Sequence, residues 1–368
     1  MLPAGDAIPV HRLYAYRPPL PQTLKDLGMP SPSKTVLVTG GAGYIGSHAA
    51  KMLARSGYQP VVYDNLTRGH EWAVRWGPLV VGDIGDADLL AHTIKHHNIG
   101  AILHFAALAY VGESVTNPEL YFENNVVKSL TLLKTAWQAG VKHTVFSSTC
   151  ATYGSPEILP ITERERQRPI NPYGETKLCV ERALHWYDMA HGTTSVALRY
   201  FNAAGGDLDG EIGEAHSPET HLIPLVFDAA QGGKPIAIFG TDYDTPDGTC
   251  IRDYIHVTDL ADAHVKALHY LREGGPPTAL NLGTGQGYSV KEILASVEAV
   301  TGRPVPHRIA ERRAGDPPTL VADPSLANET LRWKPQCSDI ETIVRSGWHW
   351  HRTRNAAGPA DPAGTPRG

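Results

Sequence analysis

Short apolar runs alternate along this chain with longer segments of helical periodicity. The expected strands are residues 35–39, 60–64, 79–83, 101–105, 144–148 and 195–200. The expected helices are about 44–56, 86–97, 118–139 and 173–190. Alternation at this rhythm predicts an α/β fold with a parallel, doubly wound sheet.

After residue 205 the alternation breaks and turn residues increase, which predicts a second, smaller α/β lobe. The expected parts are a poorly ordered extension (1–33), a Rossmann-type nucleotide-binding domain (34–205), a C-terminal lobe that mainly binds substrate (206–354) and a loose tail (355–368). The extension carries seven prolines and no sustained periodicity. A stretch such as 251–270 is a candidate to return to the first domain.

A glycine cluster, Thr-Gly-Gly-Ala-Gly-Tyr-Ile-Gly (39–46), separates the first expected strand from the first helix. Gly40 suits the tight turn, Gly43 allows close approach to a pyrophosphate, and Gly46 allows the helix to pack on the strand. About 20 residues on, Asp64 ends the second strand, where its carboxylate can accept from ribose hydroxyls and would repel a 2′-phosphate. The pattern predicts a dinucleotide site that prefers NAD to NADP.

Two residues near this site leave alternatives open. Arg68 weakens the preference for NAD, unless it is a solvated loop arginine, which is the interpretation we favour. Asp83 ends the third strand at the same edge. It could meet the adenine amino group, or it could cap the helix at 86–97.

Tyr173 and Lys177 lie four residues apart, which places them on one face of the expected helix, one turn apart. A free phenol has a pKa of about 10. One positive charge about 5 Å away supplies roughly 3 kcal/mol toward its ionisation at an effective dielectric of about 20. We therefore expect Lys177, with an oxidised nicotinamide ring, to lower the pKa of Tyr173 toward 7 and make it a general base for a hydroxyl. The pair is a weak signal by itself and gains weight from the glycine cluster.

Composition narrows the class of protein. The chain has 368 residues, 42% of them hydrophobic, and a formal charge of −5 with no long basic block, so nucleic acid and membrane surfaces are poor candidates for partners. The four cysteines show no Cys-x-x-Cys or zinc spacing, and Cys150 and Cys179 are expected to be buried free thiols. With neither a signal-peptide pattern nor an apolar run of about 20 residues, a cytoplasmic location is expected.

The glycine spacing together with Tyr-x-x-x-Lys resembles the extended short-chain dehydrogenase/reductase superfamily. Narrower stretches resemble the UDP-glucose (UDP-galactose) 4-epimerases within it, over about residues 35–350. These stretches include Gly-Tyr-Ile-Gly-Ser-His (43–48), Val-Gly-Glu-Ser-Val (111–115), Phe-Ser-Ser-Thr-Cys-Ala-Thr-Tyr-Gly (146–154) and Arg-Asp-Tyr-Ile-His-Val (252–257). The resemblance implies a homodimer that binds NAD and a UDP-sugar and inverts C4 of the sugar through a 4-keto intermediate.

The resemblance also implies roles for individual residues. Tyr173 matches the catalytic base, Lys177 its partner on the nicotinamide ribose, and Thr149 the hydroxyl that hydrogen-bonds the sugar 4-oxygen. The implied NAD-binding positions, besides Tyr173 and Lys177, are Gly40, Gly43, Tyr44, Ile45, Gly46, Asp64, Asn65, Asp83, Ile84, Phe105, Ala106, Ala107 and Asn124. The implied UDP-sugar positions, besides Thr149, are Asn202, His221, Leu222, Ala237, Phe239, Arg252, Arg313, Asp316 and Leu320.

Three positions depart from the pattern of this group or vary within it. Ala109 stands where some members have a lysine near the cofactor. His221 stands where several have an asparagine, and its protonation could tune affinity for the diphosphate. Leu320 occupies a position where bulk limits the sugar pocket. No metal site is expected, and His48, His104 and His256 are interpreted as packed or surface residues.

The preferred sugar stays open between UDP-hexoses, UDP-N-acetylhexosamines and UDP-arabinose or UDP-xylose. Two other functions also stay open: a nucleotide-sugar 4,6-dehydratase and a non-catalytic NAD-sensing protein. Dehydratases of this superfamily place an Asp-Glu pair after the active-site threonine, whereas Cys150 and Ala151 follow Thr149 here. A sensing protein would have no need of an intact Thr149, Tyr173 and Lys177.

Overall fold

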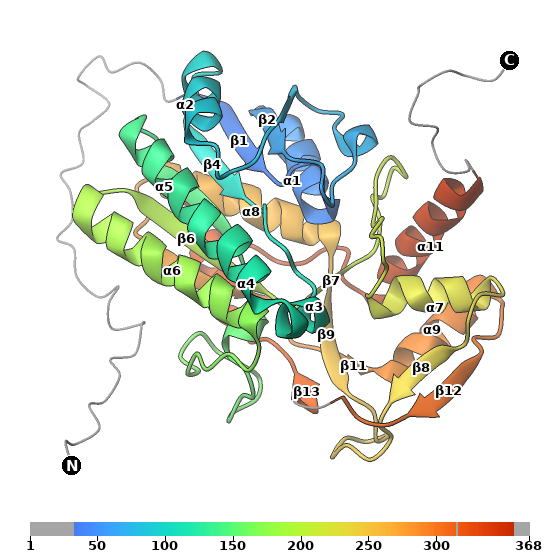
Figure 1. The fold of residues 1–368 in the computed structure, drawn as a ribbon. Helices are drawn as coiled ribbons and strands as arrows, with labels where there is room; N and C mark the ends of the chain where they lie inside the picture. The colour runs from blue at the N-terminus through green and yellow to red at the C-terminus, as the bar shows by residue number, and fades with distance from the viewer. Residues whose placement is uncertain (1–32, 314–315, 357–368) are drawn as a thin grey trace, which may run out of the picture.

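A computed structural model describes residues 33–313 and 316–356. Its larger part is built on a parallel seven-stranded sheet (Figure 1). In spatial order the strands are β10 (Thr278–Leu282), β6 (Thr194–Tyr200), β5 (His143–Thr149), β4 (Ala101–His104), β1 (Thr35–Thr39), β2 (Gln59–Asp64) and β3 (Leu79–Val81). The predicted parallel α/β fold is therefore confirmed.

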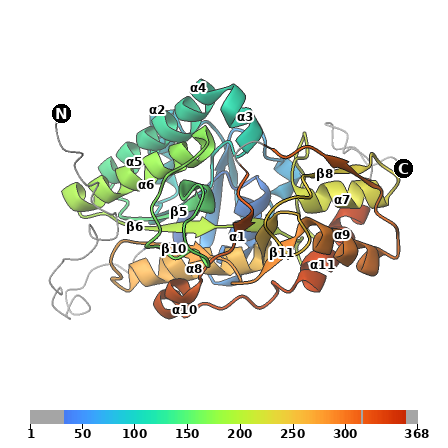
Figure 2. The same cartoon turned by 90° about the horizontal axis from the view of Figure 1, so that it is seen from below.

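Helices cover both faces of this sheet, as a doubly wound fold requires (Figure 2). One face carries α2 (Ala87–His96), α5 (Lys128–Gln138) and α6 (Pro172–His191), and the other carries α1 (Tyr44–Arg55) and α8 (Val257–Arg272). The short helix α10 (Ser325–Leu331) packs beneath α8 and β10. Since α8 and β10 follow residue 205 in sequence, the chain returns to the larger part after entering the lobe.

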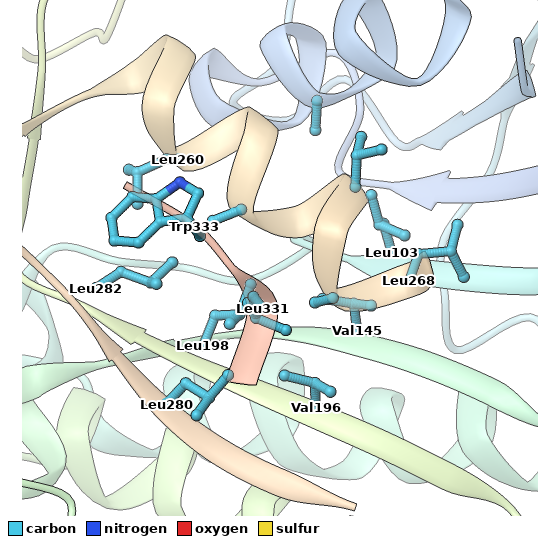
Figure 3. Packing of buried hydrophobic residues seen from close by; sticks show 14 of the residues in the cluster. Leu103, Val145, Val196, Leu198, Leu260, Leu268, Leu280, Leu282, Leu331 and Trp333 are labelled. Atoms are coloured by element: carbon cyan, nitrogen blue, oxygen red, sulfur yellow. The ribbon is translucent and has the colours of Figure 1, made fainter. Parts of the chain in front are cut away.

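The alternation of side chains along each strand builds two separate cores. In β1, Val36 and Val38 face α1 and α8, whereas Leu37 faces α2 and α5. Figure 3 shows the first of these cores, in which strand side chains such as Leu198 pack against α8. Trp333, fully buried, closes this core and donates from its indole nitrogen to the Asp259 carbonyl at 3.1 Å.

The smaller lobe packs three helices against short strands. The helices are α7 (Leu222–Ala230), α9 (Val290–Thr301) and α11 (Ile340–Ala356). The strands are β7 (Asn202–Ala204), β8 (Ile236–Phe239), β9 (Ile251–His256), β11 (Gly287–Ser289), β12 (His307–Ala310) and β13 (Thr319–Leu320). Strand β8 pairs with β12, and β9 pairs with β7, β11 and β13. None of the helices in the described ranges has the length and apolar character needed to cross a bilayer.

The long helix expected over 118–139 is interrupted. It consists of α4 (Pro118–Tyr121), a π-helical stretch η3 (Phe122–Val127) and α5, with α3 (Val111–Thr116) before it. The buried Asn125 side chain in η3 accepts a hydrogen bond from the Leu108 nitrogen and donates to the Leu108 carbonyl and the Thr176 hydroxyl. The elements η2 (Glu71–Ala73) and η4 (Cys150–Thr152), by contrast, are short 3₁₀ helices. Most of the predicted extension and tail lies outside the described residues.

Candidate active site

A cavity of about 1770 Å³ lies where the carboxyl ends of the sheet strands meet the smaller lobe. Every residue given a role above lines it. From the larger part come Gly40, Gly43, Tyr44, Ile45, Gly46, Asp64, Asn65, Asp83, Ile84, Phe105, Ala106, Ala107, Asn124, Thr149, Tyr173 and Lys177. From the lobe and its connections come Asn202, His221, Leu222, Ala237, Phe239, Arg252, Arg313, Asp316 and Leu320. The individual roles stay predictions, but the fold brings all of these residues to one cavity.

The glycines between β1 and α1 differ in what surrounds them. Gly40 has φ +72°, and a Cβ there would lie 2.5 Å from the Ala106 nitrogen. A Cβ on Gly46 would lie 2.2 Å from the Gly40 carbonyl oxygen, whereas one on Gly43 would meet only that oxygen, at 3.3 Å. Helix α1 also begins without a side-chain cap or an acidic residue in its first turn. A bare helix N-terminus behind a glycine turn fits a dinucleotide pyrophosphate.

Asp64, at the end of β2, is held in place by its own turn. One carboxylate oxygen accepts from the Ala42 nitrogen at 3.0 Å and the other from the Leu66 nitrogen at 2.8 Å. Burial raises the pKa of Asp64, against these hydrogen bonds. The carboxylate is therefore positioned at the cavity by backbone donors, as an acceptor for ribose hydroxyls would need to be.

Our interpretation of Arg68 as a solvated loop residue is wrong. Its guanidinium pairs with Glu113 at 2.9 Å, lies 4.9 Å from the centre of the Tyr110 ring, and donates to the Ser217 carbonyl. These partners hold the half-exposed guanidinium at the wall of the cavity.

The helix-cap alternative for Asp83 is also wrong, because Asp86 caps α2 by accepting from the Leu89 nitrogen. Asp83 accepts instead from Lys128 at 2.7 Å, Asn65 at 3.0 Å and the Gly85 nitrogen at 2.8 Å. Burial opposes its charge, but the hydrogen bonds from Lys128, Gly85 and Asn65 together outweigh burial, so the pKa of Asp83 is lowered. The residue stays ionised at the cavity edge.

Tyr173 and Lys177 are placed on α6 as expected, but their electrostatics differ from the expectation. Burial raises the pKa of Tyr173 to about 12, with a hydrogen bond to Thr149 acting in the opposite direction. Burial also lowers the pKa of Lys177 to about 7, although Glu181 opposes this. The lysine donates to the Ser147 carbonyl at 2.8 Å, and its ammonium nitrogen lies 6.0 Å from the centre of the Tyr173 ring.

The expectation of a pKa near 7 for Tyr173 included an oxidised nicotinamide ring as well as Lys177, so it stays a prediction for the enzyme with its cofactor. In the chain alone, desolvation penalises the charged forms of both residues and outweighs the attraction between them. Tyr173 by itself is protonated at pH 7. A cationic group bound in the cavity would be needed to lower its pKa further.

A buried ion pair underneath this site was not found from the sequence. Arg199 of β6 and Glu181 of α6 are almost fully buried and lie 2.6 Å apart, and the Tyr153 hydroxyl contacts Arg199 at 2.9 Å. Ser148 donates to the same carboxylate, which Arg199 keeps ionised by lowering its pKa. Glu181 lies one turn beyond Lys177 on α6, but nothing local in the sequence indicates its contact with Arg199 on β6.

At the lobe side of the cavity, several predicted substrate residues contact each other. Arg252 forms an ion pair with Asp316, and the Arg313 guanidinium lies 4.0 Å from the centre of the Phe239 ring. Leu320, paired in register with Arg252, packs on a cluster that includes Cys150, while it also lines the cavity. The two interpretations of Leu320, core packing and sugar contact, are therefore compatible.

The segment linking the two parts, residues 205–221 (the crossover segment), is held through its carbonyl oxygens. The acceptors are Gly205, Glu211, Glu214, Ala215, Ser217 and Pro218, which receive hydrogen bonds from Tyr44, Arg75, Trp350, His70, Arg68 and Tyr110, respectively. Five of these six donors belong to the larger part. The crossover segment is therefore fixed against the cofactor end of the cavity.

The side chains of the crossover segment form a cluster that sequence reasoning missed: Glu214, His216, Glu219 and His221. Glu214 contacts both histidines, lying 3.0 Å from the Nδ1 atom of His216. Burial opposes a charge on His216, but Glu214 and Glu219 outweigh it and raise its pKa to about 9. The signal was present as Glu-x-His-x-x-Glu-x-His, whereas only His221 was considered.

Among the other polar residues, the interpretation of His48, His104 and His256 as packed or surface residues agrees with the structure, because all three are buried. Each makes at least one hydrogen bond within the fold. The four cysteines are free thiols; Cys150 is buried as expected, whereas Cys179 is only partly buried.

Comparisons with known proteins agree with this geometry. Residues 36–283 match the model of the NAD-dependent epimerase/dehydratase family. A UDP-glucose 4-epimerase of Rhizobium meliloti (strain 1021) is 56% identical over 327 residues, which cover 89% of this chain and 99% of that protein.

Two solved structures extend the comparison. The UDP-glucose 4-epimerase from Brucella ovis in complex with NAD is 55% identical, with a TM-score of 0.85 over 86% of this chain and 98% of that one. The enzyme from Bifidobacterium longum, in complex with NAD+ and UDP, is 39% identical, with a TM-score of 0.83 over 88% and 99%. With such relatives along nearly their whole length, this chain belongs to the NAD-dependent epimerase/dehydratase family, among its UDP-glucose 4-epimerases.

Proposed function

We propose that this enzyme interconverts UDP-glucose and UDP-galactose by oxidising and then reducing C4 of the sugar. The observation that carries the proposal is that Tyr173 and Thr149 line the same cavity as the glycine turn and the lobe arginines. An acid/base group, a dinucleotide cradle and forked cationic donors for a diphosphate are thereby combined.

In this proposal Tyr173 accepts the proton of the 4-hydroxyl and later returns one, while the Thr149 hydroxyl holds the 4-oxygen. Lys177 holds a ribose hydroxyl of the dinucleotide from its place on α6. Gly40, Gly43 and Asp64 would hold the remainder of NAD. When bound, NAD+ supplies the hydride acceptor and, afterwards, the hydride donor for C4.

The protonation of Tyr173 makes proton abstraction and cofactor binding interdependent. Burial raises its pKa to about 12, so the chain alone holds the phenol protonated at neutral pH. A positive charge close by favours the phenolate. We infer that the base becomes competent only when the cavity holds the cationic, oxidised form of the cofactor.

Inversion requires the 4-keto sugar to present both faces to one hydride donor, so the nucleotide must stay anchored while the sugar turns. Arg252, Arg313 and Asp316 are the residues proposed to anchor it. Arg252 is already oriented by Asp316, which leaves further guanidinium donors for a diphosphate.

The 4,6-dehydratase alternative finds no support at the positions after Thr149. Cys150 is buried, and burial raises the pKa of its thiol to about 12, so it is neutral at pH 7. Ala151 has no acid/base group. Removal of a C5 proton and of water would lack the second pair of groups that it needs.

The experiment that tests the proposal is incubation with UDP-galactose and assignment of the products by NMR, with Tyr173→Phe as a control. UDP-glucose is expected as the only product, beside the remaining UDP-galactose, and no 4-keto-6-deoxy sugar should form. A dehydrated product would replace the proposal by the dehydratase alternative, and no turnover with intact NAD binding would favour the sensing protein.

We also propose that the enzyme acts as a homodimer through the outer face of η3, α5 and α6. Large apolar side chains are exposed there: Phe122, Leu130, Trp137, Trp186 and Met189. Trp137 and His191 stack at 3.8 Å, which joins the two helices into one continuous surface. Light scattering of Leu130→Glu should show a shift from dimer to monomer, and the same mass for wild type and variant would reject this face.

The cytoplasmic location stays a prediction.

A further inference from the structure

The cluster of Glu214, His216, Glu219 and His221 has the composition of a transition-metal site. Two imidazole nitrogens and two carboxylate oxygens, one from each residue, lie within 4.8 Å of one another. Imidazole ligands suit zinc and its neighbours, and zinc also accepts carboxylate oxygen. Magnesium and calcium, by contrast, prefer sites made of oxygen alone.

Two distances in the cluster are close to those between the ligands of a tetrahedral ion, whereas the contact of Glu214 with His221 is closer than such a site requires. Zinc binds nitrogen at about 2.0–2.1 Å and oxygen at about 2.0–2.2 Å, so neighbouring ligand atoms in a tetrahedron are about 3.4 Å apart. The Nδ1 atom of His216 lies 3.0 Å from a Glu214 oxygen and 3.6 Å from a Glu219 oxygen. Both distances fall within about half an ångström of the required value.

One atom of the cluster lacks a directional partner among the described residues. The Nδ1 atom of His216 is buried and makes no hydrogen bond, although it forms ion pairs with Glu214 at 3.0 Å and Glu219 at 3.6 Å. Buried polar atoms are almost always hydrogen-bonded, so one without a bond calls for an explanation such as an ion. A metal ion between the ring nitrogen and the two carboxylates would satisfy it.

The backbone around the cluster is already fixed. Glu219 accepts from the nitrogens of Thr220 at 2.7 Å and His221 at 2.9 Å, which orients its carboxylate. The carbonyls of Glu214, Ala215, Ser217 and Pro218 are held from outside the crossover segment. Such outer contacts are what orients the ligands of a metal site.

A second group of acids in the same segment carries no such inference. Asp207, Asp209 and Glu211 all lie 2.6–2.7 Å from the ammonium of the buried Lys51. The ammonium occupies the position among the three carboxylates that a metal ion would take, so these acids form an anchor for α1.

We propose that Glu214, His216, Glu219 and His221 bind a Zn²⁺ ion that locks the crossover segment at the edge of the cavity. The ion would take the Nδ1 atom of His221, the atom that now contacts Glu214. The other ring nitrogen would then carry the proton, so His221 would reach the cavity as a neutral hydrogen-bond donor of fixed tautomer. The proposal concerns binding and is independent of the catalysed reaction.

The test is titration of the full-length, NAD-bound enzyme with Zn²⁺ after chelator treatment, by calorimetry, and with Co²⁺ by visible absorption. We expect one high-affinity ion per chain and the intense cobalt bands of a tetrahedral site. Glu219→Gln keeps an oxygen that can accept from the same two backbone nitrogens, and should weaken Zn²⁺ binding by at least about 100-fold. His216→Asn should do the same.

The matched control is the double variant His92→Asn, His96→Asn. These two histidines are exposed on α2 with their ring centres 5.7 Å apart, so they are the alternative surface site at which Zn²⁺ could bind. The double variant should bind as wild type does. Zn²⁺ binding that disappears with the α2 pair, weak binding without tetrahedral cobalt bands, or full affinity in both cluster variants would each overturn the proposal.

Discussion

Two glycines of one turn should fail in different ways when each is replaced by alanine. A Cβ on Gly46 would lie 2.2 Å from the Gly40 carbonyl oxygen, and 2.9 Å from two further backbone atoms. To reach even 3.0 Å the turn would have to retreat by about 0.8 Å. Overpacking of this kind costs about 1–3 kcal/mol, which corresponds to a fall in Tm of roughly 1–4 °C for a chain of this size.

Gly43 offers the contrast, because its added Cβ would meet only one atom, at 3.3 Å. Its φ of −83° is also ordinary for alanine. Gly43→Ala should therefore leave the Tm of the NAD-free protein within about 0.5 °C of wild type, since the fold has space for the methyl group. The loss should fall instead on the dinucleotide, whose pyrophosphate is predicted to pass there.

The assay is thermal unfolding of both variants and wild type without NAD, followed by calorimetric titration with NAD. We expect Gly46→Ala to lower the Tm before any ligand is added, and Gly43→Ala to reduce NAD affinity by at least about tenfold at an unchanged Tm. Equal Tm losses in the two variants, or an unaltered Tm in Gly46→Ala, would refute the division of roles.

The remaining predictions concern the reacting groups and the pocket. Tyr173→Phe should lower kcat by at least about 100-fold while NAD stays bound; near-wild-type turnover would exclude it as the base. Lys177→Met should raise the kinetic pKa assigned to Tyr173. Burial lowers the pKa of Lys177 from 10.5 to about 7, so the buried lysine destabilises the fold fully below pH 7, and this cost disappears as the pH rises to 10.5. Lys177→Met should therefore raise the Tm of the NAD-free protein most at pH 7 or below and little near pH 10.5. A pH-independent change in Tm would contradict this. Asp64→Ala should narrow the preference for NAD over NADP, measured as the ratio of the two affinities. Leu320→Tyr should depress turnover of UDP-N-acetylgalactosamine more than that of UDP-galactose or UDP-arabinose, whereas equal losses would mean a folding defect.

How much could be predicted depended on whether a feature is local in sequence. The strands, the glycine turn and Asp64 were predictable because each obeys a short-range rule of periodicity or spacing. The return of β10 to the sheet edge beside β6 was not, since 77 residues separate Tyr200 from Thr278. Position in a sheet depends on the complete fold.

The electrostatics were the least predictable part of the site. The Tyr173–Lys177 spacing was evident, but the balance between attraction and desolvation depends on how deeply both groups are buried. The partners of Arg68, which lie at Glu113 and Ser217, come from two distant segments. The four residues of the Glu214 cluster are close in the sequence, but their side chains meet only because the crossover segment folds back on itself.

The late arrival of Trp333 in the first core has a consequence for synthesis on the ribosome. Leu260 and Leu268 of α8, Leu280 of β10 and Trp333 all face β-strand side chains that are translated long before them. A nascent chain that has emerged only to residue 205 therefore has β5 and β6 with one apolar face uncovered, because the helix that packs there is α8. Such a chain needs protection from aggregation until about residue 333 has left the exit tunnel, so the larger part completes its folding late.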